Sequence, residues 1–259
     1  MRVPLYQVDA FTSRLFAGNP AAVCPLDGWL EDQTLQAIAA ENNLSETAYF
    51  VKRGDRTHLR WFTPTLEVDL CGHATLAAAF VILNYLDPSR DAVAFDTLSG
   101  ELVVRRDGGL LSMDFPSRPP VACEVPPKLT EALGIAPQAT LASRDLMAVF
   151  DTEDEVRSLS PRMDVLAQLD AFAVIVTAPG KDVDFVSRFF APRAGVDEDP
   201  VTGSAHSTLT PYWSKRLNKP QLHALQVSRR GGELWCEDRG GRVIIKGNAV
   251  LYLEGAIHI

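Results

Sequence analysis

Apolar and polar residues alternate with the two-residue period of a half-buried β-strand in several parts of the chain. Residues 3–11 show this alternation first, and residues 110–115 show it again near the middle. Further strand-like runs lie near the C-terminus, where glycine-containing pairs that suit tight turns separate them. These runs are residues 222–227, 233–237, 242–246 and 249–253. The pattern therefore predicts a chain that is rich in strands.

Each half of the chain also contains a helix that leads into a β-branched and aromatic strand. In the first half, residues 32–42 have helical periodicity, and Asn42-Asn43 can supply a left-handed stop before a strand at 47–51. In the second half, Ser160-Pro161 predicts a helix start before a strand at 172–176. The matching order of elements predicts two related α+β halves.

A longer phrase occurs twice and supports an internal duplication. The spacing in the two copies is identical up to a Val-Asp pair, after which the second copy has three additional residues in a stretch that includes Asp199-Pro200. We therefore expect two pseudo-symmetric halves that build one site together. The first copy reads Arg60-Trp61-Phe62-Thr63-Pro64, Val68-Asp69 and Cys71-Gly72-His73-Ala74, and the second reads Arg188-Phe189-Phe190-Ala191-Pro192, Val196-Asp197 and Thr202-Gly203-Ser204-Ala205.

The helix that follows the first copy has no charged face. A helix that is apolar all round is buried on all sides, so residues 72–83 predict a central helix wrapped by a curved, barrel-like sheet. The corresponding helix in the second half starts at Gly203 and is expected to kink or end at Pro211.

A proline-rich run at residues 116–120 predicts the link between the halves. We expect one domain at residues 1–115 and a second at residues 116–249. Residues 250–259 are candidates to pack back onto the first domain.

The two matched glycines are candidates for substrate binding. Gly72 and Gly203 each open a helix, where backbone N–H groups lack an internal partner and the helix dipole favours an anion. The alternative is that these glycines only permit a tight start of the helix beside a strand.

Polar residues that differ between the copies are candidates for the chemistry. Glu46 stands just before a buried apolar strand, and burial of a carboxyl group suits it to proton transfer. His73 at a helix start can hydrogen-bond a substrate or help to transfer a proton. Asp199 lies in the stretch that only the second copy contains. The alternatives are a solvated turn for Glu46, a structural cap for His73 and a surface acidic turn for Asp199.

The positions of the cysteines and histidines argue against a two-cysteine racemase and against a metal site. Cys71 corresponds to Thr202, so the two thiols that a symmetric two-cysteine racemase needs are not both present. His206 has the position of a packing or hydrogen-bonding residue. The spacing of histidines, cysteines and carboxylates predicts no metal site, and no Walker or dinucleotide-binding motif predicts a cofactor.

The composition of the chain limits the kinds of molecule that the protein is expected to bind and the compartment in which it is expected to occur. The net charge of −8 argues against nucleic acid, whose binding depends on basic patches, and it means that an anionic substrate must be held by local groups. The longest apolar run, residues 76–83, is too short to span a bilayer, and the start of the chain does not resemble a secretion signal. The scattered cysteines favour a reduced, cytoplasmic setting.

The chain resembles the phenazine biosynthesis PhzF-like family of isomerases, within the diaminopimelate epimerase-like superfamily. The resemblance extends over essentially the whole sequence. The stretches that carry it are Asp9-Ala10-Phe11-Thr12, Phe16-Ala17-Gly18-Asn19-Pro20, Asn43-Leu44-Ser45-Glu46-Thr47-Ala48, Cys71-Gly72-His73-Ala74-Thr75 and Glu198-Asp199-Pro200-Val201-Thr202-Gly203-Ser204-Ala205.

The resemblance implies an α+β fold of two similar domains, each a barrel-like mixed or antiparallel sheet around a central helix, with the site in the cleft between them. It implies cofactor-free proton transfer on a small anionic substrate, and often a homodimer. Glu46 matches the family's general acid/base, while His73 and Asp199 match groups that orient the substrate and assist protonation. Substrate-binding positions are implied at Asn19, Gly72, His73, Gly203 and Ser204.

Three other functions remain open from the sequence. An amino-acid epimerase or racemase would use Glu46 with a second base. A catalytically silent member of the family would act as a ligand sensor or an interaction protein. A hotdog-type thioester enzyme is suggested only by the central-helix architecture. The identity of the substrate is not encoded in any recognisable motif.

Overall fold

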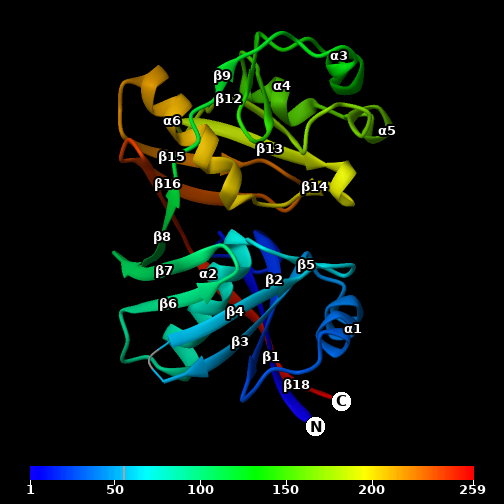
Figure 1. Ribbon diagram of the computed structural model, residues 1–259. Coiled ribbons are helices and arrows are strands. Elements are labelled where there is room, and N and C mark those ends of the chain that lie inside the picture. Colours follow the sequence, from blue (N-terminus) through cyan, green and yellow to red (C-terminus); the bar gives the residue numbers. More distant parts are fainter. Residues whose placement is uncertain (55) are drawn as a thin grey trace. The chain divides into compact units, whose positions relative to one another are not determined.

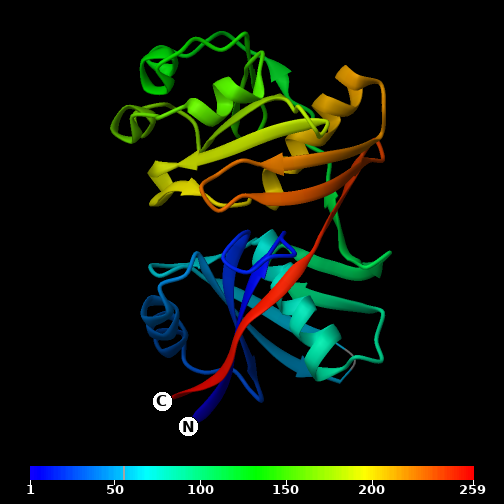
Figure 2. The same cartoon turned by 180° about the vertical axis from the view of Figure 1, so that it is seen from behind.

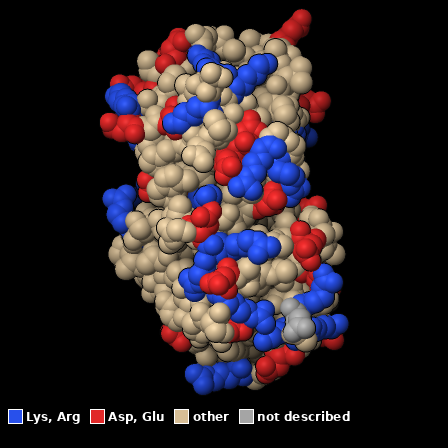
Figure 3. Space-filling view, turned by 90° about the vertical axis from the view of Figure 1, so that its left-hand side faces the viewer, with Lys and Arg blue, Asp and Glu red and all other residues tan. Residues whose placement is uncertain are grey.

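The computed structural model describes residues 1–54 and 56–259 of the chain. Two compact units are present (Figure 1): unit 1 is Met1–Asp114 together with Lys246–Ile259, and unit 2 is Phe115–Ile245. Among the described residues, no helix combines the length and apolar character needed to cross a membrane. On the face in Figure 3, acidic and basic side chains are interspersed.

Unit 1 is a mixed sheet with a helix inside it. Strand β1 pairs antiparallel with both β2 and β18, β2 runs parallel to β3, and β3 pairs antiparallel with β4. The elements are β1 (Arg2–Ala10), β2 (Asn19–Leu26), α1 (Asp32–Asn42), β3 (Glu46–Arg53), β4 (Arg56–Phe62), β5 (Glu67–Val68), α2 (Gly72–Val81), a π-helical turn (Ile82–Leu86), β6 (Ala92–Thr97), β7 (Gly100–Asp107), β8 (Leu110–Pro116) and β18 (Ala249–His258).

Helix α2 is the central helix that its sequence predicts. Every residue in it except Phe80 is buried, and it packs against β1, β2, β3, β7 and β18 (Figure 2). Helix α1 ends as expected, because Asn43 adopts the left-handed conformation with φ of 49° and its N–H donates to the Ala39 carbonyl.

Unit 2 has a comparable sheet with short helices around it. Strand β12 pairs antiparallel with β13 and parallel with β11, while β15 pairs antiparallel with β16. The elements are β9 (Val121–Ala122), α3 (Leu129–Leu133), β10 (Ala139–Ala142), β11 (Leu146–Val149), α4 (Glu153–Ser158), α5 (Met163–Leu166), β12 (Val174–Pro179), β13 (Phe185–Ala191), a 3₁₀ turn (Pro192–Ala194), β14 (Val196–Asp199), a second 3₁₀ turn (Gly203–Ala205), α6 (His206–Leu217), β15 (Gln221–Gln226), β16 (Gly232–Asp238) and β17 (Arg242–Gly247).

The predicted helix start at Ser160-Pro161 is wrong. Helix α5 begins at Met163, with Arg162 as its N-cap residue, and lasts about one turn. The following strand begins at Val174 rather than at residue 172. The Phe172 ring before it is 48% exposed and lies under the guanidinium of Arg144 at 4.4 Å.

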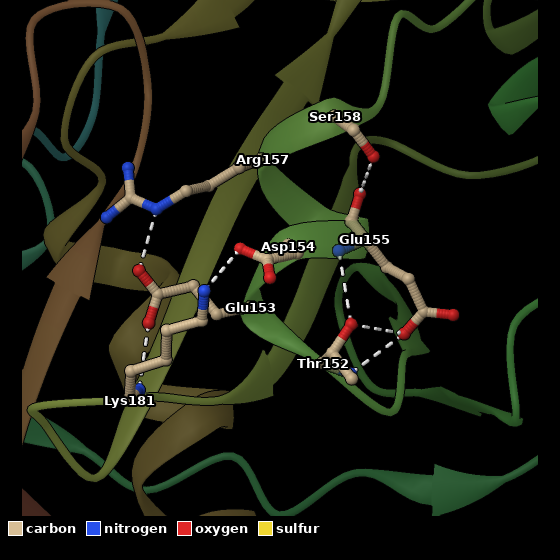
Figure 4. Close-up of polar contacts among 7 residues, drawn as sticks. All are labelled: Thr152, Glu153, Asp154, Glu155, Arg157, Ser158 and Lys181. Atoms are coloured by element: carbon tan, nitrogen blue, oxygen red, sulfur yellow. Dashed lines mark hydrogen bonds and ion pairs between the residues drawn. The ribbon is translucent and has the colours of Figure 1, made fainter.

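A neighbouring helix has a capping signal that the periodicity did not single out (Figure 4). Helix α4 starts with a capping box, in which the Glu155 N–H donates to Thr152 Oγ1 and the Thr152 N–H donates to Glu155 Oε2. The Glu153 carboxylate on the same helix accepts from Arg157 Nε at 2.7 Å and from the Lys181 N–H at 2.9 Å.

Helix α6 does not end at Pro211 but continues to Leu217. A proline inside a helix removes the hydrogen bond to the carbonyl four residues earlier, which is that of Ser207. The Ser207 carbonyl instead accepts from the Arg118 N–H at 2.9 Å. The expected interruption is therefore compensated by a segment far away in the sequence.

The two copies of the repeated phrase make equivalent contacts. Arg60 forms a two-pronged ion pair with Glu67, with both distances 2.7 Å, and its guanidinium lies over the Phe62 ring. Arg188 does the same with Glu198, at 2.7 and 3.0 Å, and lies over the Phe190 ring. The matched arginines and rings support the internal duplication in three dimensions, although the carboxylates come from different places in the phrase, Glu67 before the Val-Asp pair and Glu198 after it.

Candidate active site

Glu46 is the first residue of β3 and does not lie in a solvated turn. Its strand runs parallel to β2, with Glu46 paired to Ala21, and its side chain is 18% exposed. The Oε2 atom lies 3.0 Å from Nε2 of His73, which is the second residue of α2. The strand and the buried helix thus bring together two residues that the sequence separates.

His73 contacts Asn19 through Nδ1 and Glu46 through Nε2. The imidazole is 5% exposed, and its Nδ1 atom lies 3.2 Å from the side-chain amide nitrogen of Asn19. With the amide in this orientation, a neutral His73 ring accepts at Nδ1 and carries its proton on Nε2, the atom that faces Glu46. Asn19 is fully buried at the start of β2 and contacts the His73 ring on the side opposite Glu46.

Cys71 completes this group as the N-cap residue of α2. Its Sγ lies 3.5 Å from Nδ1 of His73. Burial, together with the nearby Glu46 carboxylate, raises the pKa of the Cys71 thiol to about 11, so the thiol stays protonated at neutral pH. Burial also lowers the pKa of His73, but Cys71 and Glu46 more than offset this, and the pKa of His73 lies well above its usual value.

The sequence spacing predicted no metal site, yet the fold gathers three potential ligands. One donor atom from each of Glu46, Cys71 and His73 lies within 4.8 Å of the others. A carboxylate, a thiol and an imidazole form a ligand set that suits zinc. The spacing did not reveal it because Glu46 comes from a different element.

Asp199 lies in unit 2, as the last residue of β14, and is not a free surface turn. Its Oδ2 atom accepts from the Thr202 hydroxyl at 2.5 Å. The buried side chain of Gln226 joins both residues: its Oε1 accepts from the Thr202 N–H, and its Nε2 donates to the Asp199 carbonyl, each at 2.8 Å. No sequence signal pointed to Gln226.

Gly203, Ser204 and His206 follow this network in the chain. Gly203 and Ser204 form the 3₁₀ turn that precedes α6, with Gly203 buried and Ser204 half-buried. His206 has the structural contacts that its position suggested, since its Nδ1 donates to the Thr202 carbonyl at 2.9 Å. Complete burial lowers the pKa of His206 to about 4, so the ring is neutral at pH 7.

A separate cavity of about 520 Å³ lies within unit 2. None of the residues around it is a predicted site residue. Its lining includes Lys128, Arg144, Asp145 and Gln168.

The chain has the α+β fold of epimerase-like proteins. The chain matches the solved structure of a probable proline racemase of Agrobacterium radiobacter with a TM-score of 0.65 over 99% of this chain and 93% of that one, at 9% identity, which shows a shared fold.

The particular family follows from closer matches. A family model described as phenazine biosynthesis-like protein matches residues 8–255. An uncharacterized isomerase of Pseudomonas aeruginosa is 53% identical over the full length of both chains. The crystal structure of a PhzF-family phenazine biosynthesis protein of Enterococcus faecalis has a TM-score of 0.98 and 48% identity, again over all of both chains. This chain belongs to the phenazine biosynthesis-like (PhzF) family, which confirms the resemblance and the fold class expected from the sequence.

Proposed function

We propose that the protein is a cofactor-independent isomerase that moves a proton between carbons of a small carboxylic acid or amino-acid-like molecule, with Glu46 as general acid/base. The observation that carries the proposal is the buried contact between Glu46 Oε2 and His73 Nε2. Neither atom has a well-aligned hydrogen bond to any described residue, so both retain capacity for a substrate.

In the proposed reaction, the Glu46 carboxylate removes a proton from an activated C–H bond. The electron pair left on carbon is delocalised into the substrate as an enolate-like charge, and the His73 Nε2–H group stabilises it. Protonated Glu46 then delivers the same proton to a different carbon, which restores the carboxylate. The first N–H groups of α2, starting at Gly72, are suited to hold an anionic group of the substrate.

Residues of unit 2 have a supporting role in this proposal. We propose that Asp199 and Ser204 orient the substrate and assist protonation, and that the N–H groups that begin at Gly203 hold a second anionic group. The internal duplication favours this assignment, since Gly72 and Gly203 occupy equivalent places in the repeated phrase. We also propose a cytoplasmic homodimer, which light scattering of the purified protein tests.

An amino-acid racemase is the second candidate, and the shared fold with a probable proline racemase favours it. The two reactions differ in the carbon that receives hydrogen. In D₂O with NMR detection, an isomerase gives a product with its new C–H bond at a different carbon, which carries protium when Glu46 returns the same proton and deuterium when the Glu46 acid exchanges with solvent first. A racemase instead gives α-deuterated product of inverted configuration. Exclusive α-exchange with inversion would replace the isomerase proposal with the racemase.

A ligand must first be found for that experiment. Small dicarboxylates and amino acids are screened for thermal stabilisation, because a ligand at a hundredfold excess over its Kd adds about 2.7 kcal/mol to the stability of the folded state. Hits are then incubated in D₂O with the protein. Tight ligands that never exchange or convert would favour the third reading, a silent ligand-binding protein.

A further inference from the structure

The group at the start of α2 has the composition of a soft-metal site. Glu46 offers a carboxylate oxygen, Cys71 a sulfur and His73 a ring nitrogen, all within 4.8 Å of one another. Ligand atoms around a tetrahedral zinc ion lie roughly 3.5 Å apart, so the three donors would have to move closer together, and the Cys71 thiol, which lies 3.5 Å from Nδ1, would have to turn toward the Nε2 side of the ring. The set contains sulfur and nitrogen, which Mg²⁺ and Ca²⁺ avoid and Zn²⁺, Co²⁺ and Cd²⁺ accept.

Burial and missing hydrogen bonds point to a ligand at this place. His73 is 5% exposed, and its Nε2 atom and Glu46 Oε2 have no well-aligned hydrogen bond among the described residues. The two atoms lie 3.0 Å from each other but are poorly aligned, and buried polar atoms without an aligned hydrogen bond are costly and usually have a better partner. A cation next to both atoms would satisfy them, and the partly exposed Glu46 side chain offers a path from solvent.

We propose that Glu46, Cys71 and His73 form a binding site for one thiophilic divalent cation of the zinc type, with the fourth coordination position open to water or substrate. Cys71 loses its proton to solvent when the metal binds, so the thiolate and the carboxylate together balance the charge of the ion. Asn19 supports the site from outside: with its amide group reversed, its oxygen accepts from the Nδ1–H of a metal-bound His73.

Metal binding would block the proposed chemistry. An ion on Glu46 removes the carboxylate from proton transfer, so the cation is an inhibitor of the isomerase rather than its cofactor. Inhibition of turnover by the metal ion rests on the proposed function, whereas the binding of the ion to Glu46, Cys71 and His73 does not. The net charge of −8 favours accumulation of cations around the protein.

The test uses Co²⁺ as the probe, because a thiolate bound to Co²⁺ gives a charge-transfer band in the near ultraviolet. The full chain carries the substitution Cys123→Ser, which removes the one exposed thiol among its four free cysteines. We expect one equivalent of Co²⁺ to produce the band and to release one proton, and Zn²⁺ to abolish the band by displacement. An excess of Mg²⁺ should leave it unchanged.

Two further variants assign the ligands. Adding Cys71→Ser should eliminate the band and weaken Zn²⁺ binding at least tenfold, and serine suits an N-cap position, so the fold should persist. Glu46→Gln should also weaken binding at least tenfold while it retains the band at high Co²⁺. The proposal is overturned if the Cys123→Ser protein gives no band, or if the band survives Cys71→Ser.

The two proposals fail independently. Metal binding without loss of turnover in Glu46→Gln would remove only the proposed function. Loss of turnover in Glu46→Gln without a cobalt band would remove only the metal site.

Discussion

The side-chain amide nitrogen of Asn19 lies 3.2 Å from the Nδ1 atom of His73, and in the neutral ring this contact places the proton on Nε2, facing Glu46. A buried asparagine thus selects the tautomer of the histidine that lies beside the candidate base. This relationship decides whether His73 presents a donor or an acceptor to Glu46 and to a substrate.

Replacement of Asn19 should therefore impair turnover through His73. In Asn19→Asp, a carboxylate accepts from Nδ1–H, so in the neutral ring an unprotonated Nε2 faces the Glu46 carboxylate and can no longer donate. We expect a loss of kcat of about 100-fold, within the range of acid–base catalysis, and a change of tautomer in ¹⁵N NMR of the imidazole. Asn19→Ala is the control for folding. An unchanged His73 tautomer in Asn19→Asp would contradict the assignment.

Gln226 should stabilise the segment from Asp199 to Thr202. Its Nε2 group donates to two oxygens there, the Asp199 carbonyl and the Thr202 hydroxyl. Gln226→Glu places a carboxylate oxygen against both, so we expect a loss of about 1–3 kcal/mol in the free energy of unfolding, measured by urea denaturation. Gln221→Glu, at an exposed position of the same strand, is the matched control. Equal stability of the two variants would exclude this role.

His206 should make stability depend on pH in a defined window. Burial lowers its pKa to about 4 from the ordinary 6.5, so between these values the unfolded chain binds a proton that the folded chain does not. Stability contributed by the neutral ring is complete above pH 6.5 and is lost as the pH falls toward 4, by about 3 kcal/mol in total.

The comparison of His206→Gln with the wild type isolates this effect from other groups that titrate in the same range. We expect the variant to lose a part of the slope of unfolding free energy against pH between 4 and 6.5. His258→Gln, which removes an exposed histidine, should keep the wild-type slope. Parallel curves for His206→Gln and the wild type would contradict the buried neutral state.

Asp145 should be destabilising as a carboxylate. It is 2% exposed beside the cavity of unit 2, and its burial raises its pKa although Arg144 and Arg118 oppose the shift. A raised carboxyl pKa means that the ionised form costs stability above the unfolded pKa. Asp145→Asn should therefore raise the melting temperature at pH 7 and have no such benefit at pH 3. A lower melting temperature at pH 7 would show that the arginine contacts prevail.

Local patterns in the sequence predicted those structural features that depend on residues close together in the chain. The stop of α1 at Asn43 follows from a left-handed residue at the helix end, and the burial of α2 follows from its lack of a charged face. The repeated phrase singled out Gly72, His73 and Ser204 as candidates because copies of one sequence are expected to occupy equivalent places in a duplicated fold.

Contacts between distant segments were not predictable in this way. Nothing near Pro211 shows that the Arg118 N–H satisfies the Ser207 carbonyl and lets α6 continue. Likewise, Gln226 and Asn19 are ordinary amides in the sequence, and only the folded sheet brings them to Thr202 and His73. The chemical properties of one residue can be read from the sequence, whereas the residue that it contacts from a distant segment depends on the tertiary structure.

The most direct measurement compares turnover and ligand affinity in Glu46→Gln and Glu41→Gln with the ligand found by thermal screening. Glu41 is an exposed carboxylate on α1, so its variant controls for the loss of one negative charge. We expect Glu46→Gln to lose at least 1000-fold in kcat, roughly the scale of acid–base catalysis, with Kd within about threefold of the wild type. Glu41→Gln should match the wild type. Turnover near the wild-type rate in Glu46→Gln would contradict the role of Glu46 as the group that carries the proton.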